Sequence, residues 1–419
     1  MTGARRDRAG SPEYGVAIVG AGQAGHQLAF SLRERNYLRP IVLIESEDAI
    51  PYQRPPLSKE YLFAAGDPGD VSLASTEEYA DHGIEFRSGR RVESVDRGRR
   101  EVLFSPGEAL RYEQLVLATG VRARTLDVPG LPLAGVGTLR TLRDAQQLRR
   151  RLEDAADVLV VGGGFIGLEF ATGAAQHGRR VTVLEACPRI LQRSLSAPTA
   201  AFLHDRHTAN GVEVRTNVAV ARIVGRGGHV AGVQLTDGQV LPADLVVVGV
   251  GVVPNDELAV RAGLVIDRHG IVVDEFLRTS DPFVHAIGDV ASFPSSFARA
   301  RGRVESVQNA IDQARCLAGT PSPYQDLPWF WSHQAGHLVQ IAGIGQAGGS
   351  AHVLGSPGQV PFSTFRYHAD ELVAIESVDQ PRIHMKARRL LRDGISIPPD
   401  HLAGPDLFDN ARGRSSVIN

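Results

Sequence analysis

Two glycine-rich turns in this chain have the residue types and the spacing that bind nucleotide phosphates. The first glycine of such a turn permits a tight bend, the second lets the backbone approach a pyrophosphate, and the third allows close helix–strand packing. The N-terminus of the helix that follows stabilises the phosphate charge. The sequence therefore predicts two dinucleotide sites, built on Gly20, Gly22 and Gly25 and on Gly162, Gly164 and Gly167.

A glutamate follows the second strand of each predicted motif. Glu45 comes 20 residues after Gly25, and Glu185 follows the apolar segment Val181–Leu184. A carboxylate at this position accepts hydrogen bonds from ribose hydroxyls. Glu185 would also repel the 2′-phosphate of NADPH, and Arg189 is the only cation that follows it closely. The second site is therefore predicted to favour NADH.

The elements around each turn are those of a strand–turn–helix–strand unit. Two later apolar segments, Leu115–Ala118 and Leu245–Val250, are predicted to be the last strands of the two units, and Asp127–Gly130 is predicted to link the units. The other predicted elements are the strands Tyr14–Val19, Ile41–Ile44, Val158–Val161 and Val181–Leu184 and the helices His26–Arg35 and Leu168–Gln176.

This order of elements predicts an α/β protein with two Rossmann-like dinucleotide-binding domains and a C-terminal α+β domain. The simplest topology places one nucleotide domain inside the other. The first would comprise residues 1–120 and 250–325, the second residues 121–249, and the C-terminal domain residues 326–419. The last domain is expected to contain the strands Val360–Tyr367 and Leu372–Val378 and the helix Ile383–Arg392.

Composition places the chain among ordinary globular proteins. It has 419 residues, 43% hydrophobic and 22% charged, with 45 Lys and Arg against 47 Asp and Glu. The net charge of −2 gives no global sign of a nucleic-acid partner. The only cysteines, Cys187 and Cys316, form no C-x-x-C, zinc or iron–sulfur pattern. Redox chemistry would therefore need a carrier other than cysteine.

No segment of the sequence has the character of a membrane anchor. The first fifteen residues are polar and basic without the apolar stretch of a secretory signal, and are expected to be a disordered lead-in. The longest apolar runs are strand-sized, far below the roughly 18 residues that span a bilayer. A cytoplasmic protein without membrane contact is the expectation.

From about Val16 to Leu391 the chain resembles the FAD-dependent NADH:ferredoxin reductases, a putidaredoxin reductase-like family with the glutathione reductase-type fold. By this resemblance the first dinucleotide is FAD and the second is NADH. The strings that carry it are Pro51–Lys59, Leu115–Gly120, Leu139–Thr141, Thr279–Pro282, Ala286–Asp289, Arg303–Ala310 and Pro328–Ser332.

The resemblance also implies roles for single residues. Lys59 would lie beside the flavin, where relatives pair this lysine with a glutamate, and Glu169 is the matching partner. A cation there favours the reduced anionic flavin. Phe165 would cover the flavin until the nicotinamide displaces it, and Trp331 would border the flavin ring. The carboxylate of Asp289 would reach a ribityl hydroxyl from a helix start. Further FAD contacts are implied for Ala24, Arg54, Val92, Arg140 and Val307.

Two features of the C-terminal domain bear on partner choice. A basic run at helical spacing could steer an acidic ferredoxin, or could be an ordinary solvated helix face; it contains Lys386, Arg388, Arg389 and Arg392. Relatives commonly have Asp and Tyr where this chain has His333 and Ala335, and this departure is expected to retune partner choice or flavin potential. His333 and His337 are expected to be two ordinary histidines, since no further ligand completes a metal set.

The implied function is transfer of a hydride from NADH to FAD and of single electrons to a [2Fe–2S] ferredoxin. That ferredoxin would serve a cytochrome P450 or a Rieske oxygenase. A rubredoxin as acceptor and a flavoprotein resembling apoptosis-inducing factor, which regulates association, remain open as alternatives. An NADH oxidase or disulfide reductase is disfavoured, because Pro55–Tyr61 contains Ser58 and no cysteine. The cognate ferredoxin and the oligomeric state are left undetermined.

Overall fold

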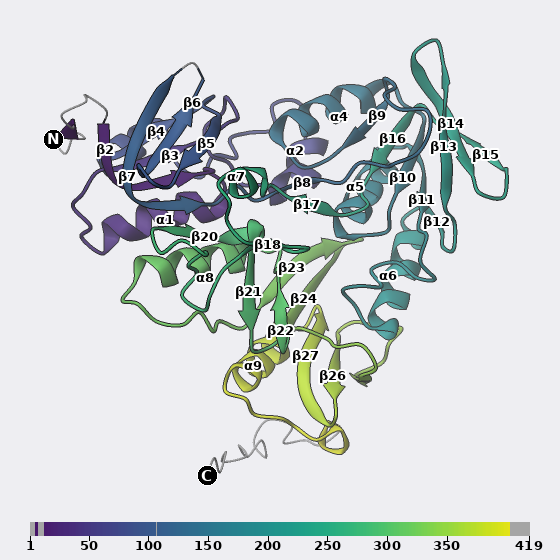
Figure 1. Ribbon diagram of the computed structural model, residues 1–419. Helices are drawn as coiled ribbons and strands as arrows, with labels where there is room; N and C mark the ends of the chain where they lie inside the picture. Colours follow the sequence, from purple (N-terminus) through teal and green to yellow (C-terminus); the bar gives the residue numbers. More distant parts are fainter. Residues whose placement is uncertain (1–4, 7–11, 106, 403–419) are drawn as a thin grey trace. The chain divides into compact units, whose positions relative to one another are not determined.

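The computed structural model describes residues 5–6, 12–105 and 107–402 (Figure 1). Most of the predicted lead-in and the end of the predicted C-terminal domain lie outside these residues. The chain forms two compact units. Unit 1 contains the chain up to Gln53 with Asp70–Arg122 and Val253–Pro328, and unit 2 contains Arg54–Gly69, Ala123–Val252 and the chain from Trp329 onward.

Unit 1 is built on an eight-stranded sheet. Four strands run parallel in the order β4-β3-β2-β7, β20 also pairs in parallel with β7, and β6 and β5 continue the sheet antiparallel. The strands are β1 (Arg5–Arg6), β2 (Pro12–Val19), β3 (Ile41–Ile44), β4 (Ile84–Arg87), β5 (Val92–Asp96), β6 (Glu101–Phe104), β7 (Glu108–Leu117) and β20 (Val284–Ala286).

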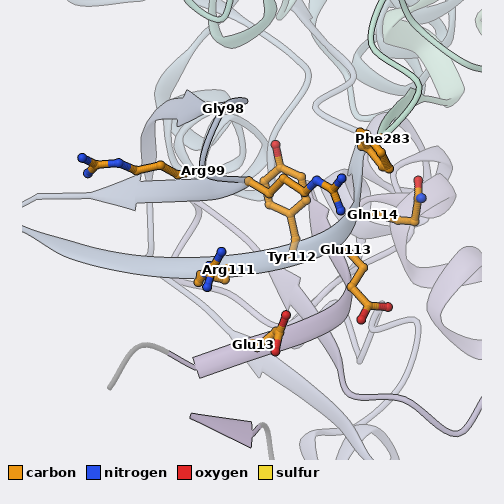
Figure 2. A pocket seen from close by; sticks show the side chains of 9 residues that line it. Glu13, Gly98, Arg99, Arg111, Tyr112, Glu113, Gln114 and Phe283 are labelled. Carbon is orange, nitrogen blue, oxygen red and sulfur yellow. The ribbon is translucent and has the colours of Figure 1, made fainter. Parts of the chain in front are cut away.

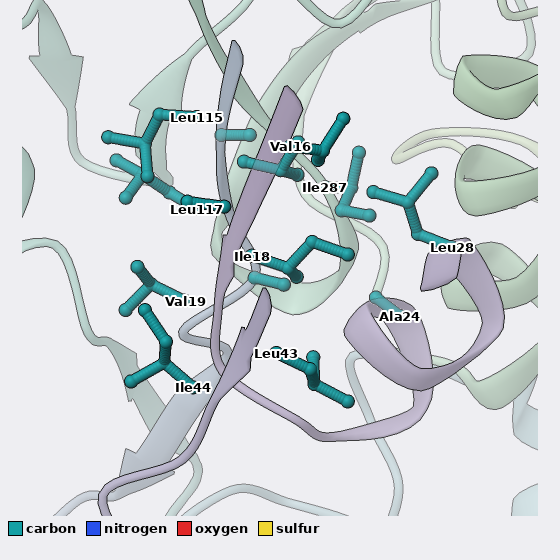
Figure 3. Close-up of a cluster of buried hydrophobic side chains, with 14 of the residues drawn as sticks. Val16, Ile18, Val19, Ala24, Leu28, Leu43, Ile44, Leu115, Leu117 and Ile287 are labelled. Carbon is teal, nitrogen blue, oxygen red and sulfur yellow. The ribbon is translucent and has the colours of Figure 1, made fainter. Parts of the chain in front are cut away.

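Apolar side chains on both faces of β2 and β3 explain why these strands are central. Every residue of β3 is buried, as in a parallel sheet covered on both faces. In Figure 3, Ile18 and Leu43 point toward Leu28 of the helix α1 (Gln23–Glu34), whereas Ile44 points to the opposite face. Alternation along a strand thus gives the sheet two apolar faces.

The remaining elements of unit 1 surround this sheet. A second sheet has the order β18-β19-β21-β22. Its strands are β18 (Ile266–Asp267), β19 (Gly270–Val272), β21 (Ala291–Ser295) and β22 (Ala300–Gly302), and the helices are α3 (Thr76–Asp81), α7 (Glu257–Arg261), η2 (Gly288–Val290) and α8 (Val307–Ala318).

Unit 2 repeats the parallel arrangement in a five-stranded sheet of order β12-β11-β10-β16-β9. Every residue of β16 (Leu245–Val248) is buried, and α5 is apolar enough to pack on the sheet with most of its residues buried. The other elements of this layer are β9 (Val136–Thr138), α4 (Leu142–Asp154), β10 (Asp157–Val161), α5 (Phe165–Gln176), β11 (Arg180–Leu184), α6 (Ala197–Ala209) and β12 (Val212–Arg215).

Two antiparallel sheets complete unit 2. One has the order β13-β14-β15 and the other the order β23-β24-β27-β26-β25. Their strands are β13 (Val220–Arg226), β14 (His229–Leu235), β15 (Val240–Pro242), β23 (Trp329–Gln334), β24 (His337–Gly343), β25 (Ser350–Leu354), β26 (Phe362–His368) and β27 (Glu371–Val378), with η1 (Pro55–Ser58), α2 (Glu60–Phe63), α9 (Pro381–Arg392) and η3 (Pro399–His401).

The chain passes between the units through two short paired strands, β8 (Val121–Ala123) and β17 (Val252–Pro254). The grouping into two units differs from the predicted three domains in two ways. It joins the second nucleotide domain to the C-terminal segment, and it places residues 54–69 in unit 2. Among the described residues, no helix is long and apolar enough to cross a membrane.

The predicted Rossmann elements are confirmed, with corrections at their ends. The last strands β7 and β16 pair with β2 and β10 as expected. Both turn helices begin three residues earlier than predicted, at Gln23 and Phe165, because their first helical turn contains the third glycine of the motif. β16 ends at Val248, two residues before the predicted end, and β26 begins at Phe362, after Pro361, which has no amide hydrogen to donate.

Candidate functional site

In the first glycine turn, only the second glycine has open space beside its Cα, at the position where a phosphate would lie. The first and third glycines are packed closely against the backbone. Gly20 has φ +104°, a backbone conformation that favours glycine, and a Cβ there would lie 2.3 Å from the Ala118 carbonyl oxygen. A Cβ at Gly25 would lie 2.0 Å from the Gly20 carbonyl oxygen, whereas a Cβ at Gly22 would meet nothing within 4 Å. This open space fits a pyrophosphate at the N-terminus of α1.

The second turn has the same geometry in unit 2. Gly162 has φ +108°, and a Cβ there would lie 2.4 Å from the Gly249 carbonyl oxygen. A Cβ at Gly167 would lie 2.5 Å from the Gly162 carbonyl oxygen, and the nearest atom to a Cβ at Gly164 is 3.9 Å away. Each unit therefore has its own open, glycine-lined helix N-terminus.

The two predicted ribose-binding glutamates make matching hydrogen bonds. Glu45 Oε2 accepts from Ala21 N at 2.9 Å, and Glu185 Oε2 accepts from Gly163 N at 2.7 Å. In both, Oε1 accepts from the backbone two residues further on, Glu47 N at 3.0 Å and Cys187 N at 2.7 Å. Glu45 Oε1 also accepts from Ser46 N at 2.7 Å and from Ser46 Oγ at 3.2 Å. Oε2 of each glutamate accepts a single backbone hydrogen bond, and a carboxylate oxygen has two acceptor positions, so a ribose hydroxyl can bond to Oε2.

Two arginines lie in the loop after Glu185. Arg189, the cation noted in the sequence, donates to the Leu195 carbonyl of its own loop at 2.6 Å. Arg193 was not predicted, yet its Nη2 lies 3.4 Å from where a Cβ on Gly251 would be. The pKa of the Cys187 thiol is raised, first by its hydrogen bond to Glu185. The sequence signal for Arg193 was only its position four residues after Arg189.

The other predicted site residues of unit 1 gather near the first turn or line its sheet. A Cβ on Gly288, next to Asp289, would lie 2.9 Å from the Ala24 side chain at the start of α1. Asp289 lies in the single 3₁₀ turn η2, which corrects the predicted helix start. Val307 is the first residue of α8, where backbone N–H groups have no intrahelical partner, and Val92 is the buried first residue of β5.

Unit 2 brings Lys59 and Glu169 together. Lys59 Nζ lies 2.9 Å from Glu169 Oε2, and the two side chains are 24% and 4% exposed. Lys59 Nζ also donates to the Pro55 carbonyl at 3.2 Å, which leaves one of its three hydrogens without a partner among the described residues. Ser58 Oγ donates to the same Glu169 oxygen at 2.5 Å. Ser58 is therefore a hydrogen-bond partner of the acid in this ion pair, a contact that the sequence did not indicate.

Arg54 and Arg140, both predicted to contact FAD, meet in unit 2. Arg54 Nη1 donates to the Arg140 carbonyl oxygen at 2.7 Å. Phe165 is half-buried at the first position of α5, and its ring stands edge-on to Phe330 at 4.7 Å. The predicted site residues divide between the two units, and the predicted FAD contacts fall in both. Unit 1 contains Gly20, Gly22, Ala24, Gly25, Glu45, Val92, Asp289 and Val307, and unit 2 contains Arg54, Lys59, Arg140, Gly162, Gly164, Phe165, Gly167, Glu169, Glu185 and Trp331.

Trp331 is the exposed member of a stack that also contains half-buried Trp329 and one half-buried arginine of the basic run. Its ring lies 5.5 Å from that of Trp329, and the Arg388 guanidinium lies 3.8 Å from the Trp329 ring centre. Trp331 is 38% exposed. Lys386, Arg389 and Arg392 are exposed on the same helix, and Arg392 pairs with Asp393. Arg388 is therefore held against an aromatic ring, a cation–π contact, and is not simply solvated.

A buried polar chain leads away from Glu169. Ser332 Oγ donates to Glu169 Oε1 at 2.5 Å, Gln334 Nε2 donates to Ser332 Oγ at 2.7 Å, and His207 Nε2 lies 3.0 Å from Gln334 Oε1. Sequence reasoning missed these three residues. The signal was in β23, where polar Ser332 and Gln334 alternate with Trp331 and His333 and so face inward together.

The histidines of β23 and β24 have separate surroundings. His333 is exposed, and His337 Nδ1 lies 2.7 Å from Asp379 Oδ2. In the part of the chain that the structure describes, no group of three or more His, Cys, Asp or Glu side chains could hold a metal ion. Cys187 and Cys316 are both free thiols.

A polar pocket of about 550 Å³ opens beside β7 in unit 1, away from the residues predicted as the site (Figure 2). Arg99, Arg100, Arg111, Tyr112 and Phe283 are among its lining residues. The Arg100 guanidinium lies 3.5 Å from the Phe283 ring centre. None of the nucleotide-turn residues lines this pocket.

Comparisons with known proteins agree with this geometry. Residues 14–314 match the model of the pyridine nucleotide-disulphide oxidoreductases, and residues 329–408 match a reductase C-terminal domain. Rhodocoxin reductase from Rhodococcus erythropolis is 43% identical, over 94% of this chain and 93% of its own. The ferredoxin reductase for the CYP199A2 system from Rhodopseudomonas palustris is 45% identical, with TM-score 0.91 over 95% and 99% of the two chains. The reductase in a covalent putidaredoxin reductase–putidaredoxin complex is 36% identical, with TM-score 0.91 over 95% and 99%.

Proposed function

This chain belongs to the pyridine nucleotide-disulphide oxidoreductase family and, within it, to the ferredoxin reductases, and from this premise we propose that it carries electrons from NADH through FAD to a [2Fe–2S] ferredoxin. One observation carries the proposal. The two glycine turns repeat both the open helix N-terminus and the carboxylate hydrogen bonds, as a chain that holds two dinucleotides requires.

Each dinucleotide has its own set of residues. Unit 1 holds FAD: the backbone around Gly22 binds its pyrophosphate, Glu45 a ribose, and Asp289 the ribityl chain. Unit 2 holds NADH: the backbone around Gly164 binds its pyrophosphate, and Glu185 binds the adenosine ribose. Glu185 selects NADH because its carboxylate binds the ribose hydroxyls and repels a 2′-phosphate, while the Arg189 guanidinium is bonded to its own loop.

Lys59 supplies positive charge beside the flavin. Its third ammonium hydrogen is available to a ligand, while Glu169 and the Pro55 carbonyl fix the side chain. Phe165 covers the flavin face, and Arg54 and Arg140 are further FAD contacts, as the family resemblance implies. When bound, FAD accepts two electrons from NADH together and releases them singly, which no side chain of this protein can do. The protein supplies orientation and electrostatics.

The partly exposed Trp329–Trp331–Arg388 stack and α9 form the acceptor surface. Ferredoxins are acidic, and the exposed Lys386, Arg389 and Arg392 provide the complementary charge. The ferredoxin then serves a cytochrome P450 or a Rieske oxygenase. The reaction takes place in the cytoplasm, where NADH is supplied. If a rubredoxin were the acceptor, the transfer of electrons from NADH to FAD would be the same.

The surroundings of Ser58 argue against a disulfide reductase. Ser58 occupies the segment in which those enzymes have redox cysteines, and its hydroxyl donates to Glu169. Neither free thiol belongs to a pair within the described residues. Electrons therefore leave the flavin without passing through a dithiol.

The test is NADH-driven reduction of cytochrome c by the purified, flavin-loaded protein with and without a [2Fe–2S] ferredoxin. A large ferredoxin-dependent rate, with NADPH much weaker, is expected. A rubredoxin arm distinguishes the alternative acceptor. Flavin that NADH reduces but that passes electrons to neither acceptor would contradict the proposal and direct attention to NADH-dependent association.

A further inference from the structure

Glu169 is a buried carboxylate surrounded by hydrogen-bond donors from separate parts of unit 2. Lys59 and Ser58 donate to Oε2, and Ser332 of β23 donates to Oε1. The residue is 7% exposed, and Ser58 and Ser332 are each 2% exposed. Three donors, one of them an ammonium, thus surround the two oxygens of this buried side chain.

The direction of the hydrogen bonds beyond Ser332 is fixed by a backbone carbonyl. Gln334 Nε2 donates to the Phe165 carbonyl oxygen at 3.2 Å as well as to Ser332 Oγ. A carbonyl only accepts, so the amide nitrogen of Gln334 must face Phe165 and Ser332. Ser332 Oγ accepts this bond, and its own proton is therefore directed to Glu169.

The same reasoning fixes the tautomer of His207. Gln334 presents its oxygen to His207, so His207 Nε2 must carry a hydrogen and donate it. Nδ1 then accepts from Thr172 Oγ1 at 2.8 Å. Burial lowers the pKa of His207 to about 4, so the ring is neutral near pH 7. His207 and Gln334 have no exposed surface, which shields the chain from exchange with water.

Every member of this chain thus donates toward Glu169. The order is Thr172, His207, Gln334, Ser332 and Glu169, with one consistent polarity from α6 through β23 to α5. Hydrogen bonds in such a chain polarise one another, and each donor dipole offsets part of the carboxylate charge.

We propose that His207 is a positioning residue that, through Gln334 and Ser332, holds Glu169 as a carboxylate whose charge is partly offset, and so sets the electrostatic field that Lys59 presents to the flavin. This inference rests on the proposed function only in placing a flavin beside Lys59. Loss of a donor leaves more uncompensated negative charge at Glu169, which disfavours the reduced flavin.

The test is a redox titration of the flavin in the loaded protein. His207→Leu and Ser332→Ala should both shift the flavin midpoint potential to more negative values. His207→Gln retains a donor near the position of Nε2 and should remain close to the wild type. Ser363→Ala is the matched control, because it removes a buried hydroxyl of the same sheet whose partners among the described residues are Ser377 and Gln380.

A wild-type potential in both His207→Leu and Ser332→Ala would overturn the inference, as would an equal shift in Ser363→Ala. A second readout does not depend on electron transfer. Nitrogen NMR of histidine-labelled protein should show His207 as the neutral Nε2–H tautomer at pH 7. An imidazolium or an Nδ1–H tautomer would overturn the inference. Protein that binds no flavin would contradict the proposed function alone. The inference about the hydrogen-bond chain would then be tested by the tautomer of His207.

Discussion

Glu45 and Glu185 accept the same two backbone hydrogen bonds in two copies of one motif, so each is a control for the other. Glu185→Gln keeps the size of the side chain and removes the charge that repels a 2′-phosphate. We expect the ratio of kcat/KM for NADH to that for NADPH to fall about tenfold or more, since hydrogen bonds to charged groups contribute about 1.5–3 kcal/mol. Steady-state kinetics with both nucleotides measure this ratio.

Glu45→Gln should leave that nucleotide ratio unchanged and weaken FAD retention instead. Flavin content after gel filtration measures this second effect. If Glu45→Gln changed the NADH preference as much as Glu185→Gln, the assignment of one dinucleotide to each unit would be wrong.

Lys59 provides the second test at this scale. Lys59→Met removes the cation and leaves Glu169 with only the hydroxyls of Ser58 and Ser332, whereas Lys59→Arg keeps the charge. We expect Lys59→Met to slow flavin reduction by NADH, because the negative product charge loses its nearest cation. Anaerobic stopped-flow absorbance measures the rate. Lys59→Arg is the conservative control and should keep a rate near that of the wild type. Equal rates of flavin reduction in the wild type and Lys59→Met would show that Lys59 has no part in the mechanism.

At this scale the sequence was informative where a motif defines its own geometry. The positions of Gly20, Gly162, Glu45 and Glu185 follow from spacing within one strand–turn–helix unit. The chain from Ser332 to His207 could not be predicted in this way. It joins β23 to α6 across more than a hundred residues of sequence, and hydrogen bonds of that kind depend on tertiary packing.

Among the elements, α6 is fastened to the C-terminal sheet of unit 2 by a buried acid. Glu376 of β27 has no exposed surface and accepts from Ser196 N at 2.8 Å and Ser196 Oγ at 2.6 Å. It also pairs with Arg366 at 3.2 Å. Ser196 is the residue directly before α6, so this carboxylate satisfies backbone donors that the helix itself cannot.

Glu376→Ala should destabilise the protein strongly. It leaves Arg366 and the Ser196 groups without their partner, and breaking a buried ion pair costs about 3–5 kcal/mol. Urea unfolding followed by circular dichroism measures the change. The control Glu153→Ala alters an exposed glutamate of α4 in the same unit and should change stability by about 0.5 kcal/mol or less. Similar midpoints for the two variants would show that α6 does not depend on this contact.

The sequence predicted the types of these elements better than their ends. Apolar strands such as β3 and β16 were recognised because parallel central strands are apolar on both faces. The starts of α1 and α5 were placed too late, since the glycines of a phosphate-binding turn also form the first helical turn. Asp289 was expected at a helix start because a glycine precedes it, but only the one-turn η2 forms there.

Two buried and two half-buried histidines make the whole molecule sensitive to acid. Burial is the first cause that lowers the pKa of each to about 4, from an ordinary value of 6.5. The unfolded chain therefore takes up protons that the folded chain does not as the pH falls from 6.5 toward 4. The contribution of each histidine to the free energy of unfolding is therefore fully present above pH 6.5. Below that pH it decreases by about 1.4 kcal/mol per pH unit, until the pH reaches about 4. The residues are His26, His207, His285 and His384.

We expect the thermal midpoint to fall steeply between pH 7 and pH 5, and His384→Leu to reduce that fall. Both ring nitrogens of His384 are buried without a partner among the described residues, so leucine loses no hydrogen bond there. Differential scanning fluorimetry at several pH values measures the effect. His333→Asn, at an exposed position, is the control. A pH dependence that is the same in His384→Leu and the wild type would exclude this histidine as a contributor.

The measurement that tests the central claim most directly is the electron stoichiometry between NADH and ferredoxin. Limiting NADH is mixed anaerobically with a catalytic amount of flavin-loaded protein and an excess of oxidised [2Fe–2S] ferredoxin, and the ferredoxin absorbance is followed. The account predicts two reduced ferredoxins for each NADH, at a rate that depends on the flavoprotein. Oxidation of NADH without reduction of ferredoxin would contradict it.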